Sequence, residues 1–117
     1  GYAAHISFEE GKRVHAGIQF DGGNRMAYID GVNHALLIAH MFEAGAVRRW
    51  DKDSDLNLAN QLDYDLAVLL TGDGFAVSVD GVERYRAAAK GVTMSDLALQ
   101  VSHGPASFDR VRIRRKE

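Results

Sequence analysis

The stretch that decides the fold is residues 64–86, which read YDLAVLLTGDGFAVSVDGVERYR. Apolar side chains recur at every second position in both halves of this stretch, at Leu66, Val68, Leu70, Phe75, Val77 and Val79. A period of two places such side chains on one face of a β-strand. Residues 71–74 predict a glycine-containing turn, and Asp80-Gly81 predicts a second, tight turn with positive φ angles. We therefore expect three consecutive antiparallel strands with one strongly apolar face.

The same pattern continues on both sides of this stretch. Residues 14–20 and 25–29 alternate in the same way and are joined by the turn-forming residues 21–24. A later strand carries three apolar residues on one face, Leu97, Leu99 and Val101. Regular turn signals between short alternating segments are typical of an all-β sandwich.

The last predicted strand contains an irregularity. Val111 and Ile113 would lie on one face of a strand, whereas Phe108 is out of phase with them. We expect a bulge or a bend after Asp109, because either one restores the phase. The arginines that alternate with the apolar pair then form a solvated face of the strand.

Residues 33–45 are ambiguous between helix and strand. Asn33 could cap a helix, Gly45 could end one, and most residues between them are good helix formers. As a strand, the same segment would be apolar on both faces. We expect a strand, because a β environment commonly overrides helix propensity. A helix remains the alternative.

The composition indicates a single folded domain. The chain has 117 residues, of which 46% are hydrophobic and 26% charged, and its formal net charge is -2. This length suffices for one hydrophobic core. So small a net charge gives no electrostatic field that would attract a phosphate backbone, so nucleic acid is not an expected partner. The absence of cysteine excludes disulfides and thiolate zinc sites. Residues 35–42 are far short of the roughly 20 apolar residues that span a bilayer, so no membrane insertion is expected.

Residues 66–81 and the ending SFDRVRI at residues 107–113 resemble the concanavalin A-like lectin and glucanase superfamily in its laminin G-like form. In that family a strand, a short glycine-containing turn, an apolar strand and Asp-Gly are followed later by a closing strand of the Phe-Asp-x-Val type. Residues 14–20 also look like a family strand. The resemblance covers residues 14–115 and implies an all-β fold, an antiparallel jelly-roll β-sandwich. Residues 1–12 fit it least well.

The modules that this chain resembles most occur in large bacterial secreted, calcium-dependent repeat proteins and adhesins. The resemblance therefore implies an extracellular or cell-surface location. The chain begins with Gly1 and Tyr2 rather than Met. We accordingly expect residues 1–117 to be a single sandwich domain, excised from a larger protein or preceded by a tag remnant.

The residue pattern does not predict an enzyme. Glycosidases of the superfamily project two carboxylates from one strand in a Glu-x-Asp-x-x-Glu pattern, which does not occur here. Glu9 and Glu10 are adjacent and would face opposite sides of a strand. The five histidines lack the spacing of a transition-metal site, and no serine lies in a Gly-x-Ser-x-Gly motif.

One acidic segment has the spacing of a calcium loop. An oxygen ligand recurs at every second position, at Asp51, Asp53, Asp55 and Asn57. Calcium requires several such oxygens to converge at about 2.4 Å. An EF-hand is excluded, because Leu56 and Leu62 stand where that loop needs Gly and Glu. The alternative is a solvated acidic turn between strands.

Trp50 lies next to this acidic segment and is a candidate for sugar binding. Its ring could stack on the apolar face of a pyranose, while Asp51 and Asn57 accept hydrogen bonds from sugar hydroxyls. Asp21 and Asn24, in a predicted hairpin turn, could join the same polar site. The competing explanation is that Trp50 is a core or rim residue and that Asp and Asn in turns serve backbone geometry alone.

Together these features predict a non-catalytic carbohydrate-binding or adhesion module of a larger secreted or surface protein. Its partner would be a glycan or matrix polysaccharide, and calcium is the one candidate cofactor. The alternative is a structural or assembly domain that associates with copies of itself or with neighbouring domains. That alternative rests on residues 35–42, whose second face would otherwise be exposed at Ala35, Leu37, Ala39 and Met41.

Overall fold

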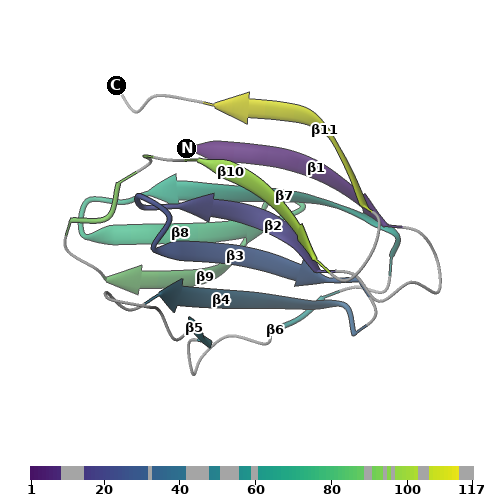
Figure 1. The fold of residues 1–117 in the computed structure, drawn as a ribbon, viewed down its shortest axis with the longest axis horizontal. Helices are drawn as coiled ribbons and strands as arrows, with labels where there is room; N and C mark the ends of the chain where they lie inside the picture. The colour runs from purple at the N-terminus through teal and green to yellow at the C-terminus, as the bar shows by residue number, and fades with distance from the viewer. Residues whose placement is uncertain are drawn as a thin grey trace.

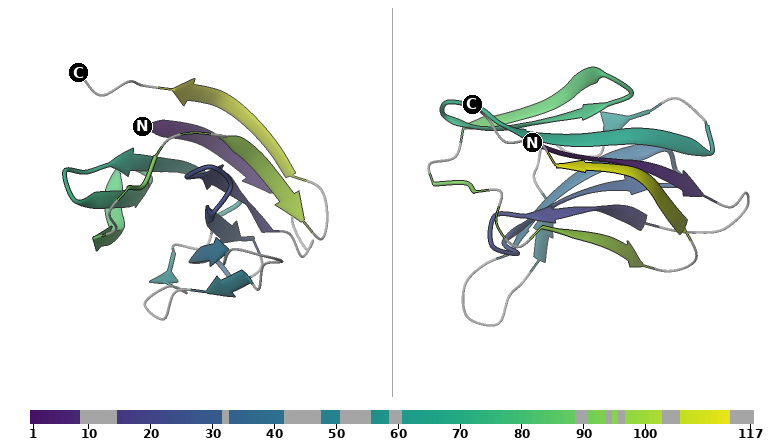
Figure 2. Two further views of the ribbon diagram at one scale, coloured as in Figure 1. Left: turned by 60° about the vertical axis from the view of Figure 1, so that its left-hand side comes forward. Right: turned by 90° about the horizontal axis from the view of Figure 1, so that it is seen from above.

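The computed structural model is an all-β protein in which two antiparallel sheets pack together (Figure 1). The two layers separate most clearly in the right-hand view of Figure 2. The structure describes residues 1–8, 15–31, 33–41, 48–50, 56–58, 61–88, 91–93, 95, 97–102 and 106–113. The predicted fold class is thereby confirmed as far as an antiparallel sandwich.

The first sheet has five strands in the order β11-β1-β7-β8-β9. They are β1 (Tyr2–Phe8), β7 (Asp63–Leu70), β8 (Gly74–Val79), β9 (Val82–Ala88) and β11 (Ala106–Ile113). The two predicted hairpins are confirmed, since β7 pairs with β8 from Leu66 and Val79 onward and β8 pairs with β9. Asp80 and Gly81 between β8 and β9 have φ angles of 54° and 82°, as a tight primed turn requires.

The second sheet follows the order β10-β2-β3-β4-β5, and a further short strand, β6, also pairs with β4. Its strands are β2 (His15–Phe20), β3 (Arg25–Asp30), β4 (Ala35–Met41), β5 (Arg48–Trp50), β6 (Leu56–Asn57) and β10 (Ala98–Ser102). The predicted strand at residues 14–20 is therefore confirmed over residues 15–20, and residue 14 lies outside the described residues. The strands predicted at residues 25–29 and around Leu99 are confirmed as well.

The ambiguous segment forms a strand rather than a helix. β4 pairs with β3 over six residue pairs on one side and with β5 and β6 on the other. Ladders on both edges satisfy its backbone N–H and C=O groups, and these tertiary pairings outweigh the local preference for helix.

The second face of β4, which motivated the assembly alternative, is buried at Ala35 and Ala39. Ala35 is 2% exposed and Ala39 is 0% exposed. Ala39 packs with Met26 and Tyr28 of β3 in a small cluster that is separate from the main core, and Leu37 packs against this cluster. The apolar residues on this face therefore serve the packing of the chain itself.

The first strand, β1, lies at the N-terminal end of the described residues. Its residues alternate between buried and half-buried, and it lies between β11 and β7. Its pairing with β11 contains the irregularity predicted after Asp109. Ala3 faces Arg112 whereas His5 faces Asp109, so one residue of β1 opposes two residues of β11.

Aromatic side chains join the two sheets at both ends of the sandwich. Phe20 of β2 meets Phe75 of β8 edge to face, with ring centroids 5.2 Å apart. At the opposite end, His34 before β4 and Tyr64 of β7 lie with Nδ1 and the hydroxyl 2.8 Å apart. Phe20, Phe75 and Tyr64 are almost completely buried, and side chains of this size dominate the stability of a core.

Gly17 is a position in the second sheet that cannot accept a side chain. A Cβ there would lie 1.8 Å from the carbonyl oxygen of Ala27.

We expect Gly17→Ala to push β2 and β3 apart and to lower the free energy of unfolding by about 3 kcal/mol, the upper end for an overpacked interior. Chemical denaturation measures this loss. Gly72→Ala is the matched control, because no atom lies within 4 Å of its Cβ, and it should change stability by less than about 0.5 kcal/mol. Equal losses in the two variants would contradict the prediction.

Candidate functional site

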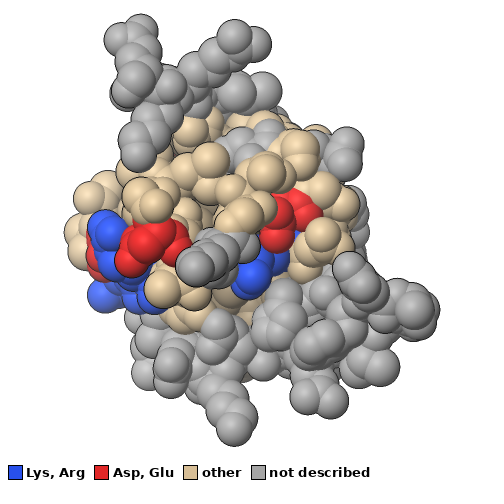
Figure 3. Space-filling model, turned by 90° about the vertical axis from the view of Figure 1, so that its left-hand side faces the viewer, with Lys and Arg blue, Asp and Glu red and all other residues tan. Residues whose placement is uncertain are grey.

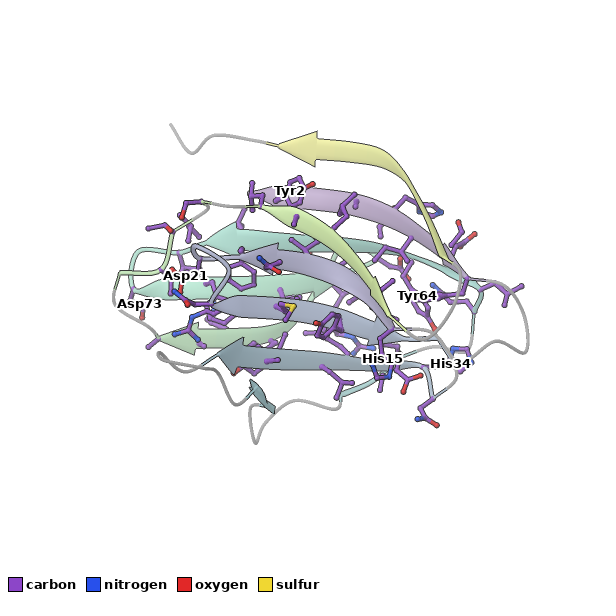
Figure 4. All side chains as sticks on the ribbon, viewed as in Figure 1. Tyr2, His15, Asp21, His34, Tyr64 and Asp73 are labelled. Carbon is purple, nitrogen blue, oxygen red and sulfur yellow. The ribbon has the colours of Figure 1, made fainter. Side chains whose placement is uncertain are left out.

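Three loop segments meet at one end of the sandwich. They are the β2–β3 turn, the β7–β8 turn and the segment after β9, at residues 21–24, 71–73 and 91–93. The N–H of Asp21 donates to the carbonyl of Thr93 (2.9 Å), and Phe20 and Phe75, which flank two of these turns, are in contact. Figure 4 shows Asp21 and Asp73 at this same end. Loops held by a rigid scaffold are where binding sites concentrate.

A hollow of about 490 Å³ opens at this end of the molecule. The described residues that line it are Leu70, Thr71, Gly72, Asp73, Gly74, Ala88, Gly91 and Val92. The volume falls within the roughly 300–1,000 Å³ of small-molecule sites. The lining combines apolar side chains, two polar side chains and three glycines, whose backbone groups a ligand can approach closely.

Asp73 is a hydrogen-bond acceptor in the lining of this hollow, and a contact within its own turn favours one orientation of its carboxylate. The hydroxyl of Thr71 donates to its Oδ1 (3.1 Å), and the backbone N–H of Thr71 donates to the carbonyl of Gly74 (2.9 Å). Asp73 is exposed, and its Oδ2 accepts no hydrogen bond from any residue that the structure describes. One carboxylate oxygen is thus held by the turn while the other remains available to a ligand.

Asp21 ties one wall of the hollow to the second sheet. Its Oδ1 accepts a hydrogen bond from the N–H of Thr93 (3.0 Å), and its Oδ2 accepts one from Nε of Arg25 (3.2 Å). The N–H of Gly22 donates to the carbonyl of Ser95 (2.9 Å) beside these contacts. Asp21 has a φ angle of 58°, a conformation that Asp and Asn adopt more readily than most residues. Its carboxylate therefore serves to hold the segment that contains Gly91 and Val92.

The described arginines near this end are paired with carboxylates. Arg25 is bound to Asp21, and its guanidinium carbon lies 5.4 Å from the ring centre of Phe75. Arg86 donates to Glu83 through Nη2 (2.7 Å) and Nε (3.2 Å). These hydrogen bonds lower the pKa of Glu83 and raise the pKa of Arg86. Figure 3, which looks onto this end, shows acidic and basic side chains side by side in two groups.

Three of the residues predicted to bind sugar lie toward this end of the second sheet. Asp21 and Asn24 form the β2–β3 turn, in which the N–H of Asn24 donates to the carbonyl of Asp21 (3.0 Å). The backbone of Trp50 pairs with Ala39 of β4, and Ala39 pairs in turn with Met26, one residue from the start of β3. The row of pairs that contains Trp50 is therefore close to the β2–β3 turn.

Asn57 lies elsewhere on the same sheet. It pairs with Ala35, four residues along β4 from the partner of Trp50, a distance of about 13 Å at roughly 3.3 Å per residue. The structure thus places Trp50 and Asn57 apart along the edge of β4. The other predicted ligands, Asp51, Asp53 and Asp55, lie outside the described residues.

The opposite end of the sandwich holds a polar cluster around the buried Asp30. Asp30, with 7% of its side chain exposed, accepts hydrogen bonds from the backbone N–H (3.1 Å) and the side-chain amide (3.0 Å) of Asn33. Nε2 of His15 lies 3.3 Å from Oδ2 of the same carboxylate. Beside it His34 contacts Tyr64, whose pKa is raised mainly by burial. The Asp-x-x-Asn spacing of residues 30–33 was the local signal for this turn.

A third polar group lies on the outer face of the first sheet. Nδ1 of His5 is 2.6 Å from Oδ1 of Asp65, and its Nε2 is 3.7 Å from Oδ2 of Asp63. Asp80 accepts hydrogen bonds from the N–H of Asp65 (2.8 Å) and from Nε2 of Gln61 (2.6 Å). These contacts link β1, β7 and the β8–β9 turn. They stabilise the register of the sheet at its surface.

Among the residues that the structure describes, no three His, Asp or Glu side chains are placed to hold one metal ion. Within the same part of the chain, no helix could cross a membrane. Comparison of the chain with family models, with curated proteins and with solved structures gives no match.

The structure predicts that Asp21 holds the wall of the hollow. Asp21→Ala removes both side-chain hydrogen bonds and should cost about 2 kcal/mol of stability, with faster hydrogen exchange at the Thr93 amide. Asp21→Asn is the matched variant, because it keeps an acceptor for Thr93 and tolerates the positive φ angle, so its loss should be smaller. Amide exchange followed by NMR distinguishes the two variants. Unchanged protection of Thr93 in Asp21→Ala would show that the segment is held by other contacts.

Proposed function

We propose that this domain is a non-catalytic carbohydrate-binding or adhesion module of a larger secreted or surface protein. In this proposal the sugar occupies the hollow at the end that carries Asp21 and Asp73. The observation that carries it is the hollow itself, which combines a suitable volume with convergent polar and apolar groups.

The lining of the hollow suits a hydroxyl-rich ring. Leu70, Ala88 and Val92 offer apolar surface to the C–H face of a pyranose, while Thr71 and Asp73 can exchange hydrogen bonds with its hydroxyls. Asp73 is the one acidic residue among the described residues of the lining, whereas glycoside hydrolysis uses a pair of carboxyl groups. A binding role needs only one such acceptor.

The resemblance to the concanavalin A-like superfamily supports the same function. We propose that the two packed antiparallel sheets are connected as a jelly roll of the laminin G-like kind, a family in which sugar binding is common. An extracellular or cell-surface location follows from a glycan or matrix polysaccharide as the partner. We propose that Trp50 extends the sugar site along the edge of β4. Its backbone pairs with Ala39, which pairs with Met26 near the β2–β3 turn.

Calcium remains part of the proposal through Asp51, Asp53, Asp55 and Asn57. The support for it is the alternate spacing of oxygen ligands, together with the place of Asn57 on the edge strand β6. In this proposal the ion is held by oxygen atoms of residues 51–57, which directly follow Trp50 in the sequence.

The assembly alternative has weaker support. The face of β4 that motivated it is buried at Ala35 and Ala39. The large apolar side chains that are exposed among the described residues are Leu62, Leu69 and Val82, which belong to separate segments. Single exposed apolar residues are ordinary on a soluble surface. We therefore place carbohydrate binding first.

A glycan array tests the proposed function. We expect at least one sugar to bind and to shift the NMR signals of residues 71–74 and 91–93, because these segments line the hollow. Leu70→Asp should abolish binding, since it puts a charge where the apolar face of the ring would lie. Leu62→Asp, an equally drastic change at a residue outside the lining, should leave binding intact. Absence of any glycan hit, or identical effects of the two variants, would count against a sugar site here.

A thermal melt with and without calcium tests the ion. Calcium at about one hundred times its dissociation constant should add about 2.7 kcal/mol to the stability of the folded state. Asp53→Asn should remove this gain, because it takes away one carboxylate ligand. Magnesium serves as the control cation. An identical melting temperature in calcium and in a chelator would argue that the acidic segment is a solvated turn.

A further inference from the structure

We propose that Asp73 determines specificity in the hollow, so that the site prefers sugars bearing a protonated amine over neutral sugars and rejects sugars bearing carboxylate or sulfate. This inference rests on the proposed function, since it names the class of sugar that the same hollow takes. The charges around the hollow and the hydrogen bond from Thr71 to one oxygen of the Asp73 carboxylate support it.

The described arginines near the hollow are already bound to carboxylates. Arg25 is engaged by Asp21 at 3.2 Å, and Arg86 is engaged by Glu83 at 2.7 Å. When a guanidinium donates to a carboxylate, the negative charge of that carboxylate offsets its positive charge. Fewer of its N–H groups then remain to bind an anionic ligand. The described arginines at this end are therefore poorly placed to attract an acidic sugar.

Asp73 is the one charged residue among the described residues that line the hollow. Its carboxylate interacts electrostatically with Arg86 and helps to raise the pKa of that guanidinium, but Arg86 forms its ion pair with Glu83. Asp21, Asp73 and Glu83 together carry one more charge than Arg25 and Arg86, so this group of five side chains has a net negative charge. The local field should therefore favour a cation and oppose a second anion.

A hydrogen bond within the β7–β8 turn favours one orientation of the Asp73 carboxylate. The hydroxyl of Thr71 donates to Oδ1 (3.1 Å), which leaves Oδ2 open to a donor from a ligand. A carboxylate accepts hydrogen bonds and donates none. Sugar hydroxyls and ammonium groups can donate to it, whereas the carboxylate of a uronic acid or a sulfate ester cannot. Charge-assisted bonds are roughly twice as strong as neutral ones, so an ammonium should be preferred.

Titration of three matched ligands tests the inference. The probes are trimers of glucosamine, glucose and glucuronic acid with the same linkage, measured by calorimetry at mildly acidic pH, where the amine is protonated. We expect the glucosamine trimer to bind about tenfold more tightly than the glucose trimer, and the glucuronic acid trimer to bind about tenfold more weakly than the glucose trimer. NMR shifts at residues 71–74 should accompany binding.

Asp73→Asn removes the charge but keeps the shape of the side chain, and it should reduce the preference for the amine to about twofold or less while neutral sugar still binds. Asp63→Asn is the matched control, because Asp63 is 61% exposed in its side chain and lies outside the lining of the hollow. It should leave the preference unchanged. Melting curves should show both variants folded, since both acids are exposed at the surface.

The outcomes separate the two proposals. A glucuronic acid trimer that binds as tightly as the glucosamine trimer, or a preference that survives Asp73→Asn, would overturn the role of Asp73 while leaving a sugar site in place. Failure of all three trimers, when another glycan still shifts residues 71–74, would also overturn the stated class of ligand. Failure of every glycan would instead remove the proposed function on which this inference rests.

Discussion

The edge-to-face contact between Phe20 and Phe75 sets the spacing of the two sheets at the end that carries the hollow. Both rings are completely buried, and each lies directly beside a turn. Because a packed interior resists changes of even one methylene, the two turns cannot approach or separate freely. Arg25 extends this arrangement outward by lying over Phe75 while it holds Asp21. The rim of the hollow is therefore built on the core beneath it.

The two ends of the sandwich use polar residues differently. At the end with His15 and His34, the contacts with Asp30 and Tyr64 are largely buried and close the β3–β4 connection. At the other end, polar side chains anchor the loops, but Asp73 stays exposed to solvent with one oxygen available among the described contacts. A buried polar group that is satisfied internally contributes rigidity, whereas an oriented exposed group can contribute recognition.

Local patterns predicted most of the fold, because hairpins depend on neighbours in sequence. Residues 64–86 carry both their alternation and their turns, so the strands and the positive φ angles at Asp80 and Gly81 followed directly. The contact of His34 with Tyr64 was not predictable, since it joins residues 30 positions apart on different sheets. The same reason explains Asp21. Its turn was visible in the sequence, but its partner Thr93 lies 72 residues away, so the hydrogen bond between them could not be predicted from local pattern.

The position of β9 as the outermost strand of the first sheet, beyond β8, has a consequence for how copies of this domain behave at close quarters. Its exposed residues include Glu83, Arg84 and Arg86. Two copies could pair β9 with β9 in an antiparallel manner about a twofold axis, with any one of residues 83 to 86 facing its own copy. In each of these four registers, two glutamates or two arginines would face each other, which is unfavourable. Such charges are a common defence of open sheet margins. The charges on β9 therefore oppose its pairing with the β9 strand of a second copy.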